Sequence, residues 1–265
     1  MSEYWEERGK LPGILSVEPS AVEADRPKEE RFRRQLLAWT TMLMHRAELL
    51  PAHHLLDLGC GFGDVSVHLA PHCARITAID GSSSMIAQAR AMLAATAHAD
   101  WRVEQADLEG FTDIVGDVDL VYLGAVCSYL SDDDYAALLV RIAVNAAPGV
   151  AIVQREYVAM NGGWTGITER GNYKSYRRRA QDYIAIAERA GFTSSLPRYS
   201  SDMDIELALR FLGPVGRGLA TVVRPIGRLA LRGKKEGSST FFLRRAPADG
   251  PGTSIQRPER QLSSE

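Results

Sequence analysis

The sequence of 265 residues has few cysteines, no long apolar run and almost no net charge. Its three cysteines, Cys60, Cys73 and Cys127, are odd in number and lack C-x-x-C spacing, which excludes a disulfide scaffold and a structural zinc signature. No stretch reaches the ~18 consecutive apolar residues of a transmembrane helix, and the opening MSEYWEERGK lacks the basic and apolar parts of a signal peptide. We therefore expect a cytoplasmic protein.

The charge balance also argues against nucleic-acid binding as the function. Lys and Arg number 31 against 33 Asp and Glu, so no global field attracts nucleic acid. The six histidines are scattered without metal-ligand spacing, and we expect no metal site. With 45% hydrophobic residues and 12 prolines, the chain has enough apolar material for one sizeable core.

The order of the patterns predicts an α/β domain with helical additions. A helix is expected over 28–49, between Pro27 and Pro51, within an N-terminal helical lid of residues 1–50. From His53 to Arg155, short apolar runs alternate with helical stretches, which is typical of βαβ units and a parallel sheet. The expected strands are HLLDLG, RITAID, WRVEQAD, VDLVYLG and GVAIVQRE, and the expected helices are 63–70, 82–95 and 131–145, two of them capped by Ser82 and Ser131.

The C-terminal half is less regular in sequence. The domain is expected to span 51–247, with an irregular loop at 157–173, a helix over 174–190 and strands at 193–199 and 239–245. Within it, residues 201–236 form a basic insertion, and between Arg210 and Arg245 nine basic residues oppose one acid. The tail 248–265 is too polar to pack and is predicted to be disordered.

A glycine-rich turn follows the first expected strand. In LLDLGCGFGD (55–64), Gly59, Gly61 and Gly63 let the backbone turn sharply and let a ligand approach it closely, while the next helix directs free N–H groups to the same place. Asp64 stands where a dinucleotide fingerprint needs glycine, so the match to a nicotinamide oxidoreductase is poor.

Carboxylates end three of the expected strands. Asp57 precedes the glycine turn, Asp80 ends the second strand and Asp107 ends the third. In a parallel sheet these ends meet at one crevice, and a carboxylate there accepts hydrogen bonds from both hydroxyls of a ribose. A cationic or hydroxyl-bearing ligand suits this arrangement.

These residues resemble the class I S-adenosylmethionine-dependent methyltransferases. The motifs DLGCGFG, AIDGSSSMIAQAR, QADL, VDLVYLGAV and PGVAIV occur in that family's order over about Leu55 to Arg155. The resemblance implies a Rossmann-like, doubly wound mixed sheet of seven strands in the order 3-2-1-4-5-7-6, with strand 7 antiparallel. It also implies S-adenosyl-L-methionine as cofactor.

The resemblance assigns roles by position. Asp57 and the loop Gly59, Cys60, Gly61 and Gly63 would hold the methionine part, and Asp80 with Gly81 the ribose. Met85, Asp107 and Leu108 would enclose the adenine, and Gly124 would lie beneath the sulfonium. By the family's pattern, Tyr4, Trp5 and Arg8 would form part of a lid.

The methyl acceptor is expected to be a small molecule, because the chain lacks the N/D-P-P-Y/F motif of nucleobase and amide methylation. A hydroxyl acceptor needs a general base, and Cys127, Ser128 and Tyr129 stand where related enzymes carry a histidine pair. Glu156 and Tyr157, directly after the fifth strand, are the candidate catalytic residues, with a structural role or pairing with Arg155 as the alternative for Glu156. Trp164, Tyr173, Tyr176 and Arg177 are the candidate acceptor contacts, and the basic run at 174–179 suits an anionic acceptor.

Several functions therefore stay open. O-methylation of a sugar or secondary metabolite is favoured. Methylation of a lipid-linked or polysaccharide glycan is the first alternative, with membrane contact through the basic amphipathic segment 210–235. A non-catalytic S-adenosylmethionine-binding module is the second. The sequence leaves the oligomeric state open.

Overall fold

The computed structural model describes residues 2–18, 22–108, 111, 116–170, 173–200, 203, 215 and 236–245. Its helices are α1 (Ser2–Gly9), α2 (Ile14–Val17), α3 (Arg26–Arg46), α4 (Asp64–Leu69), α5 (Ser83–Ala94), α6 (Asp132–Asn145) and α7 (Ala180–Arg189). Short 3₁₀ turns are η1 (Glu23–Asp25), η2 (Ala70–His72) and η3 (Cys127–Tyr129). The strands are β1 (Ala52–Leu58), β2 (Cys73–Asp80), β3 (Trp101–Gln105), β4 (Leu120–Gly124), β5 (Ala151–Ala159), β6 (Gly166–Arg170), β7 (Tyr173–Arg177), β8 (Phe192–Ser194), β9 (Arg198–Tyr199) and β10 (Glu236–Arg245).

The main sheet has the order β3-β2-β1-β4-β5-β10-β8, with β9 also paired to β10. Strands β1 to β5 pair in parallel, and β10 runs antiparallel to both β5 and β8. This is the predicted order 3-2-1-4-5-7-6 with an antiparallel seventh strand, so the predicted fold class is confirmed.

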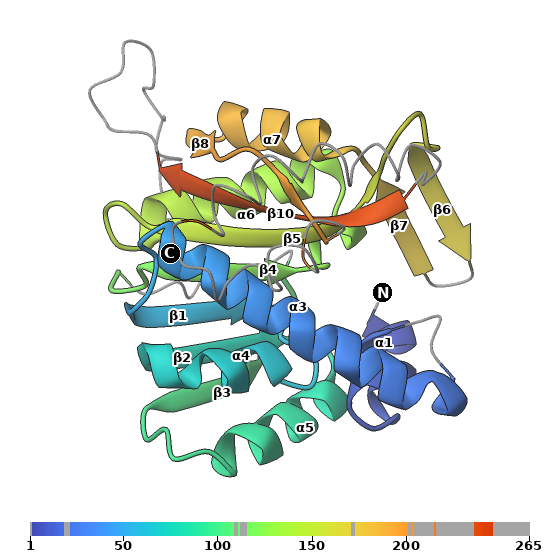
Figure 1. Ribbon diagram of the computed structural model, residues 1–265, viewed down its shortest axis with the longest axis vertical. Helices are drawn as coiled ribbons and strands as arrows, with labels where there is room; N and C mark the ends of the chain where they lie inside the picture. The colour runs from blue at the N-terminus through green and yellow to red at the C-terminus, as the bar shows by residue number, and fades with distance from the viewer. Residues whose placement is uncertain are drawn as a thin grey trace, which may run out of the picture.

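Helices cover both faces of this sheet (Figure 1). Leu55, on one face of β1, packs in a cluster with residues of α3, α4 and α5, whereas Leu56 and Leu58 pack in a cluster with α6 and α7. A strand covered on both faces has no solvent side, which explains why its sequence is continuously apolar.

The predicted serine caps are present. Ser82 Oγ accepts from the Met85 N–H at 3.2 Å at the start of α5, and Ser131 Oγ accepts from the Asp134 N–H at 3.1 Å at the start of α6. Each bond satisfies one of the backbone donors that a helix N-terminus leaves free.

The predictions for residues 157–190 need correction. β5 continues to Ala159, and β6 and β7 form an antiparallel pair where an irregular loop and the first turns of a helix were predicted. Helix α7 begins at Ala180 rather than Lys174. The aromatic and β-branched residues Ile167, Thr168, Tyr173 and Tyr176 favour strands, which explains the difference from the prediction.

The predicted strand 193–199 is divided into β8 and β9. Pro197 has no N–H to donate to the ladder, and Ser195 Oγ instead accepts from the Phe242 N–H at 3.0 Å. Both short strands still lie beside β10.

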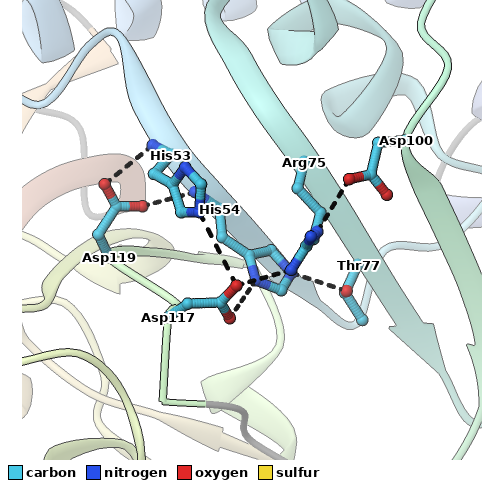
Figure 2. Close-up of polar contacts among 7 residues, drawn as sticks. All are labelled: His53, His54, Arg75, Thr77, Asp100, Asp117 and Asp119. Atoms are coloured by element: carbon cyan, nitrogen blue, oxygen red, sulfur yellow. Dashed lines mark hydrogen bonds and ion pairs between the residues drawn. The ribbon is translucent and has the colours of Figure 1, made fainter.

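A polar network joins the amino-terminal ends of β1 and β2 to the segment that enters β4 (Figure 2). Asp117 accepts from Arg75 Nη1 at 2.6 Å and lies 2.8 Å from Nδ1 of the buried His54, whose Nε2 lies 2.9 Å from Thr77 Oγ1. Asp119 accepts from the backbone N–H groups of His53 and His54. The His54 contact is the main reason that the pKa of Asp117 is lowered. Each polar group of this network is paired within the chain, so the network holds strands in register at the end opposite the glycine turn.

Two predicted segments lie largely outside the described residues. These are the basic insertion 201–236, apart from residues 203, 215 and 236, and the tail 248–265. Among the residues that the structure describes, no helix combines the length and the apolar character needed to cross a bilayer.

Candidate active site

A cavity of about 340 Å³ opens at the carboxyl ends of β1, β2 and β4, which is where ligands bind in open α/β sheets. The N-terminal helices contribute a second wall, with Trp5, Ile14, Val17, Glu18, Glu29, Phe32, Arg33 and Leu36. Of the predicted cofactor residues, the cavity is lined by Asp57, Gly59, Cys60, Gly61, Asp80, Gly81, Met85, Asp107, Leu108 and Gly124. Gly63 is not among the lining residues.

The glycine turn is shaped by three glycines in the left-handed region, Gly59, Gly61 and Gly63. Gly59 has φ 71° and Gly61 has φ 55°. A Cβ on Gly59 would lie 2.7 Å from Val126 Cγ2, and a Cβ on Gly61 would lie 2.7 Å from Val17 Cγ1. The turn therefore requires glycine for its backbone angles and for the close approach of both neighbouring walls.

Two strand-end carboxylates line the cavity with different environments. Asp57 is 1% exposed and accepts from Ser66 Oγ at 2.6 Å, and its burial raises its pKa to about 7. Asp80 is half-buried and accepts from the N–H groups of Gly61 and Ser82, both at 2.9 Å. Burial raises the pKa of Asp80 also, against the effect of these hydrogen bonds.

The lining suits S-adenosylmethionine, which carries positive charge on its sulfonium and its ammonium group. Asp57, Asp64, Asp80 and Asp107 are four carboxylates on the strand-end side of the cavity. The buried Asp57 is a group that a cationic ligand would stabilise in its ionised form. The Asp80 carboxylate accepts from the backbone N–H groups of Gly61 and Ser82, and its oxygens keep capacity to accept from ribose hydroxyls.

The long helix α3 is joined to the glycine turn by an ion pair. Arg33 Nε and Nη2 donate to the two oxygens of Asp64, the first residue of α4, at 2.6 and 3.0 Å. Both side chains are mostly buried and both line the cavity. No local sequence pattern indicates this pair, because its partners lie 31 residues apart.

Helix α1 is held against the start of α5. Glu6 accepts from the hydroxyls of Ser82, Ser83 and Ser84, which lowers its pKa to about 2, with the Ser84 bond as the largest cause. Gln88 Nε2 donates to the carbonyls of Gly9 and Leu11 at 2.6 and 2.9 Å.

The predicted lid residues of α1 have separate places. Trp5 lines the cavity and its ring meets that of Tyr129 edge to face, with centroids 5.2 Å apart. The ring of Tyr4 packs edge to face on Trp5, and Arg8 donates to the backbone carbonyls of Leu15 and Glu18. Neither Tyr4 nor Arg8 lines the cavity.

Alternation along β5 separates the two candidate catalytic residues. Successive side chains of a strand point to opposite faces, and Arg155 and Tyr157 both line the cavity whereas Glu156 does not. Tyr157 donates from its hydroxyl to Glu18 Oε2 at 2.9 Å.

Glu156 is fully buried on the other face of β5. Its Oε1 accepts from the Cys127 N–H at 2.9 Å, and burial raises its pKa to about 7. We predicted that Glu156 follows the fifth strand and faces the acceptor. Instead it lies within β5, and its hydrogen bond holds the turn that follows β4. No ion pair joins it to Arg155 among the described residues.

Arg178 fastens the same turn and does not open a helix as predicted. It is 6% exposed, donates to the carbonyls of Cys127 and Leu130 at 3.0 and 2.8 Å, and pairs with Asp132 at 2.7 Å. Glu156 thus accepts from a backbone N–H group of this turn, and Arg178 donates to two of its backbone carbonyls. The same turn carries the cavity residues Val126 and Tyr129.

The predicted acceptor contacts do not line this cavity. Trp164 is 59% exposed, Arg177 pairs with Glu236 at 3.2 Å, and the ring of Tyr176 lies near Lys174 and Arg178. The side chain of Tyr173 lies outside the described atoms.

Sequence reasoning missed Glu18, Phe32 and Arg155 as residues of the cavity wall. A charged residue inside an apolar strand was an available signal for Arg155. The described residues contain no group of three or more His, Cys, Asp or Glu placed to hold a metal ion.

Comparison with known proteins identifies the domain. A family model described as a methyltransferase domain matches residues 55–149. The trans-aconitate 2-methyltransferase of Delftia acidovorans is 32% identical over 123 residues, covering 45% of this chain and 43% of that protein. The nodulation protein S of Sinorhizobium fredii is 34% identical over 119 residues, covering 45% of this chain and 50% of that protein. The chain thus spans half or less of these curated relatives.

The fold is shared more widely than the sequence. The solved structure described as a DhpI complex with SAH superposes with a TM-score of 0.57 at 16% identity, covering 92% of this chain and 95% of that chain. The matched motifs, the sheet order and the strand-end cavity agree with one another. Residues 55–149 thus match a methyltransferase domain family, and the fold of the chain is similar to that of class I S-adenosylmethionine-dependent methyltransferases.

Proposed function

We propose that this protein transfers a methyl group from S-adenosylmethionine to a small molecule. The observation that carries the proposal is one cavity lined both by the glycine turn with its strand-end carboxylates and by a separate wall from α1, α2, α3 and β5. The first set suits the donor, and the second leaves room for an acceptor beside it. A volume of about 340 Å³ is in the range of small-ligand sites.

The donor supplies an activated methyl group on a positively charged sulfur. The chain's own contribution is to position the two reactants, since substitution at the methyl carbon requires an acceptor atom aligned within about 3–3.5 Å. Asp80 would hold the ribose and Asp57 the cationic end. Trp5, Val17 and Leu36 would exclude water from above.

O-methylation of a sugar or a secondary metabolite remains the favoured reaction. A hydroxyl acceptor needs a base, and Glu156 lies on the wrong face of β5 to serve. Tyr157, hydrogen-bonded to the Glu18 carboxylate at 2.9 Å, is the candidate that faces the cavity. One relative is named for a small organic acid, trans-aconitate, which supports a small-molecule acceptor.

The two alternatives have less support. Methylation of a membrane-bound glycan depends on segment 210–235, which lies outside the described residues except for Val215. A non-catalytic binding module would not need a second wall beside the donor site.

The proposal is tested with isotope-labelled S-adenosylmethionine and a cell extract from which large molecules have been removed. A labelled small product that forms with the wild-type protein, but not with Asp80→Ala, supports it. Tight binding of S-adenosylhomocysteine by titration calorimetry without any labelled product would favour the non-catalytic module instead.

A further inference from the structure

The cavity wall contains a buried arginine whose side chain makes no hydrogen bond or ion pair with the described residues. Arg155 is 4% exposed, and its Nε is enclosed without a hydrogen bond. Its guanidinium carbon lies 5.8 Å from the centroid of the Tyr157 ring, and its charge acts to lower the pKa of the neighbouring Glu156, with which it forms no described ion pair. A buried guanidinium without an anionic partner is costly, and side chains of this kind are normally paired.

The other arginine among the described lining residues, Arg33, is already paired with a carboxylate of the protein. Arg33 binds both oxygens of Asp64. Arg155 is therefore the one described lining residue whose positive charge is available to a ligand. The wall carries more acids than bases, and these acids include Asp57, Asp64 and Asp80 on the donor side.

The position of Arg155 places this charge on the acceptor side. β5 lies beyond β4, so Arg155 is two strands from the glycine turn that follows β1. Its Cα is the register partner of Gly124, the last residue of β4. The Arg155 carbonyl accepts from the Ala125 N–H at 2.6 Å, which fixes the strand beside the turn after β4.

We propose that the methyl acceptor carries a carboxylate group and that Arg155 binds it; this inference rests on the proposed methyl transfer. A planar guanidinium donates two parallel hydrogen bonds to a carboxylate, a geometry that fits both partners. One unpaired positive charge balances a monoanion. A phosphate dianion would leave excess negative charge beside Glu18 and the donor-side acids.

The first test measures binding, independently of turnover. The protein saturated with S-adenosylhomocysteine is titrated by calorimetry with benzoate, cinnamate and succinate, and in parallel with the neutral amide of each. We expect at least one carboxylate to bind about tenfold or more tightly than its amide, because the amide leaves a buried charge without its counterion.

Two variants assign the effect to Arg155. Arg155→Met is expected to weaken carboxylate binding about tenfold or more while S-adenosylhomocysteine affinity changes less than about twofold. Arg155→Lys keeps the charge and is expected to recover part of the binding. The matched control is Arg34→Met, which removes an arginine of α3 whose side chain is 72% exposed.

Thermal unfolding separates this role from a structural one. Without ligand, Arg155→Met is expected to raise Tm, since an apolar side chain replaces a buried charge that has no partner. A structural arginine would lower Tm on removal.

The labelled product of the extract assay gives a second, independent readout. A product that carries the carboxylate either binds an anion-exchange resin or, if the carboxylate itself is methylated, releases labelled methanol in alkali. A neutral, alkali-stable product overturns the inference, as does a failure of every carboxylate to bind the wild-type complex. Loss of S-adenosylhomocysteine affinity in Arg155→Met also overturns it, because Arg155 would then bind the donor. If the wild type binds no S-adenosylhomocysteine, the proposed function itself has failed.

Discussion

Arg33 of α3 and Asp64 of α4 form a two-point ion pair in the lining of the cavity, with N–O distances of 2.6 and 3.0 Å. The pair joins the N-terminal wall to the helix that follows the glycine turn. It neutralises one of the acids that line the cavity and links α4 to α3, which lies across one face of the sheet (Figure 1).

Removing this pair is expected to destabilise the protein. Arg33→Gln leaves Asp64 mostly buried without its counterion, and we expect a loss of roughly 1–3 kcal/mol in the free energy of unfolding, measured in urea. The control is Arg34→Gln, on the exposed side of the same helix. Equal stability of the two variants would contradict a holding role for Arg33.

Asp80→Ala is expected to weaken donor binding. Hydrogen bonds to a charged group contribute ~1.5–3 kcal/mol, so S-adenosylhomocysteine affinity should fall about tenfold to hundredfold by calorimetry. Asp133→Ala, which removes an exposed acid from the first turn of α6, is the matched control. An unchanged affinity in Asp80→Ala would refute the assignment of the ribose to this carboxylate.

Donor binding is expected to depend on pH through Asp57. Its pKa of about 7 means that it is largely protonated below pH 7 without ligand, and a cationic donor favours the ionised form. S-adenosylmethionine affinity should therefore rise about tenfold between pH 5.5 and 7.5, with proton release on binding. Asp57→Asn should flatten this rise, and a wild-type affinity independent of pH would show that the donor does not interact with Asp57.

Glu156 is expected to make the ligand-free protein less stable as pH rises. Its folded pKa of about 7 exceeds the ordinary value of 4.5, so the folded state binds more protons between these values. The protonated carboxyl stabilises the fold below pH 4.5, and that contribution, on the order of 3 kcal/mol, is lost as pH rises through 7. In Glu156→Gln the fall in Tm between pH 5 and 7.5 should be smaller than in the wild type. An identical fall would mean that Glu156 does not titrate in this range.

Glu6 is expected to control how firmly α1 covers the cavity. Glu6→Ala removes the acceptor of three serine hydroxyls at the start of α5. We expect faster hydrogen exchange in residues 2–9 and faster release of S-adenosylhomocysteine, measured by stopped flow. Glu7→Ala, one residue along the same helix, is the control. Unchanged exchange in Glu6→Ala would show that other contacts hold α1.

Most of the predicted cofactor residues line the cavity, whereas the predicted acceptor contacts do not. Asp57, Gly59 and Asp80 belong to strand ends and turns, where local sequence specifies the backbone and the strand order brings the ends to one crevice. Trp164 and Arg177 were predicted as acceptor contacts from their types and neighbourhood. The β6–β7 pair places them away from this cavity, because its register depends on pairing between segments that local spacing does not report.

Sequence by itself determined the α/β class and the glycine turn, because continuous apolar runs, serine caps and glycines act through the neighbouring backbone. The order of the strands was implied by the resemblance to a known family. Only the tertiary structure decided which side chains meet across the cavity. The facing of Arg155 and the burial of Glu156 follow from a one-residue alternation along β5, and the Arg33 and Asp64 pair from the crossing of α3. These are properties of packed elements, so no single segment of the sequence encodes them.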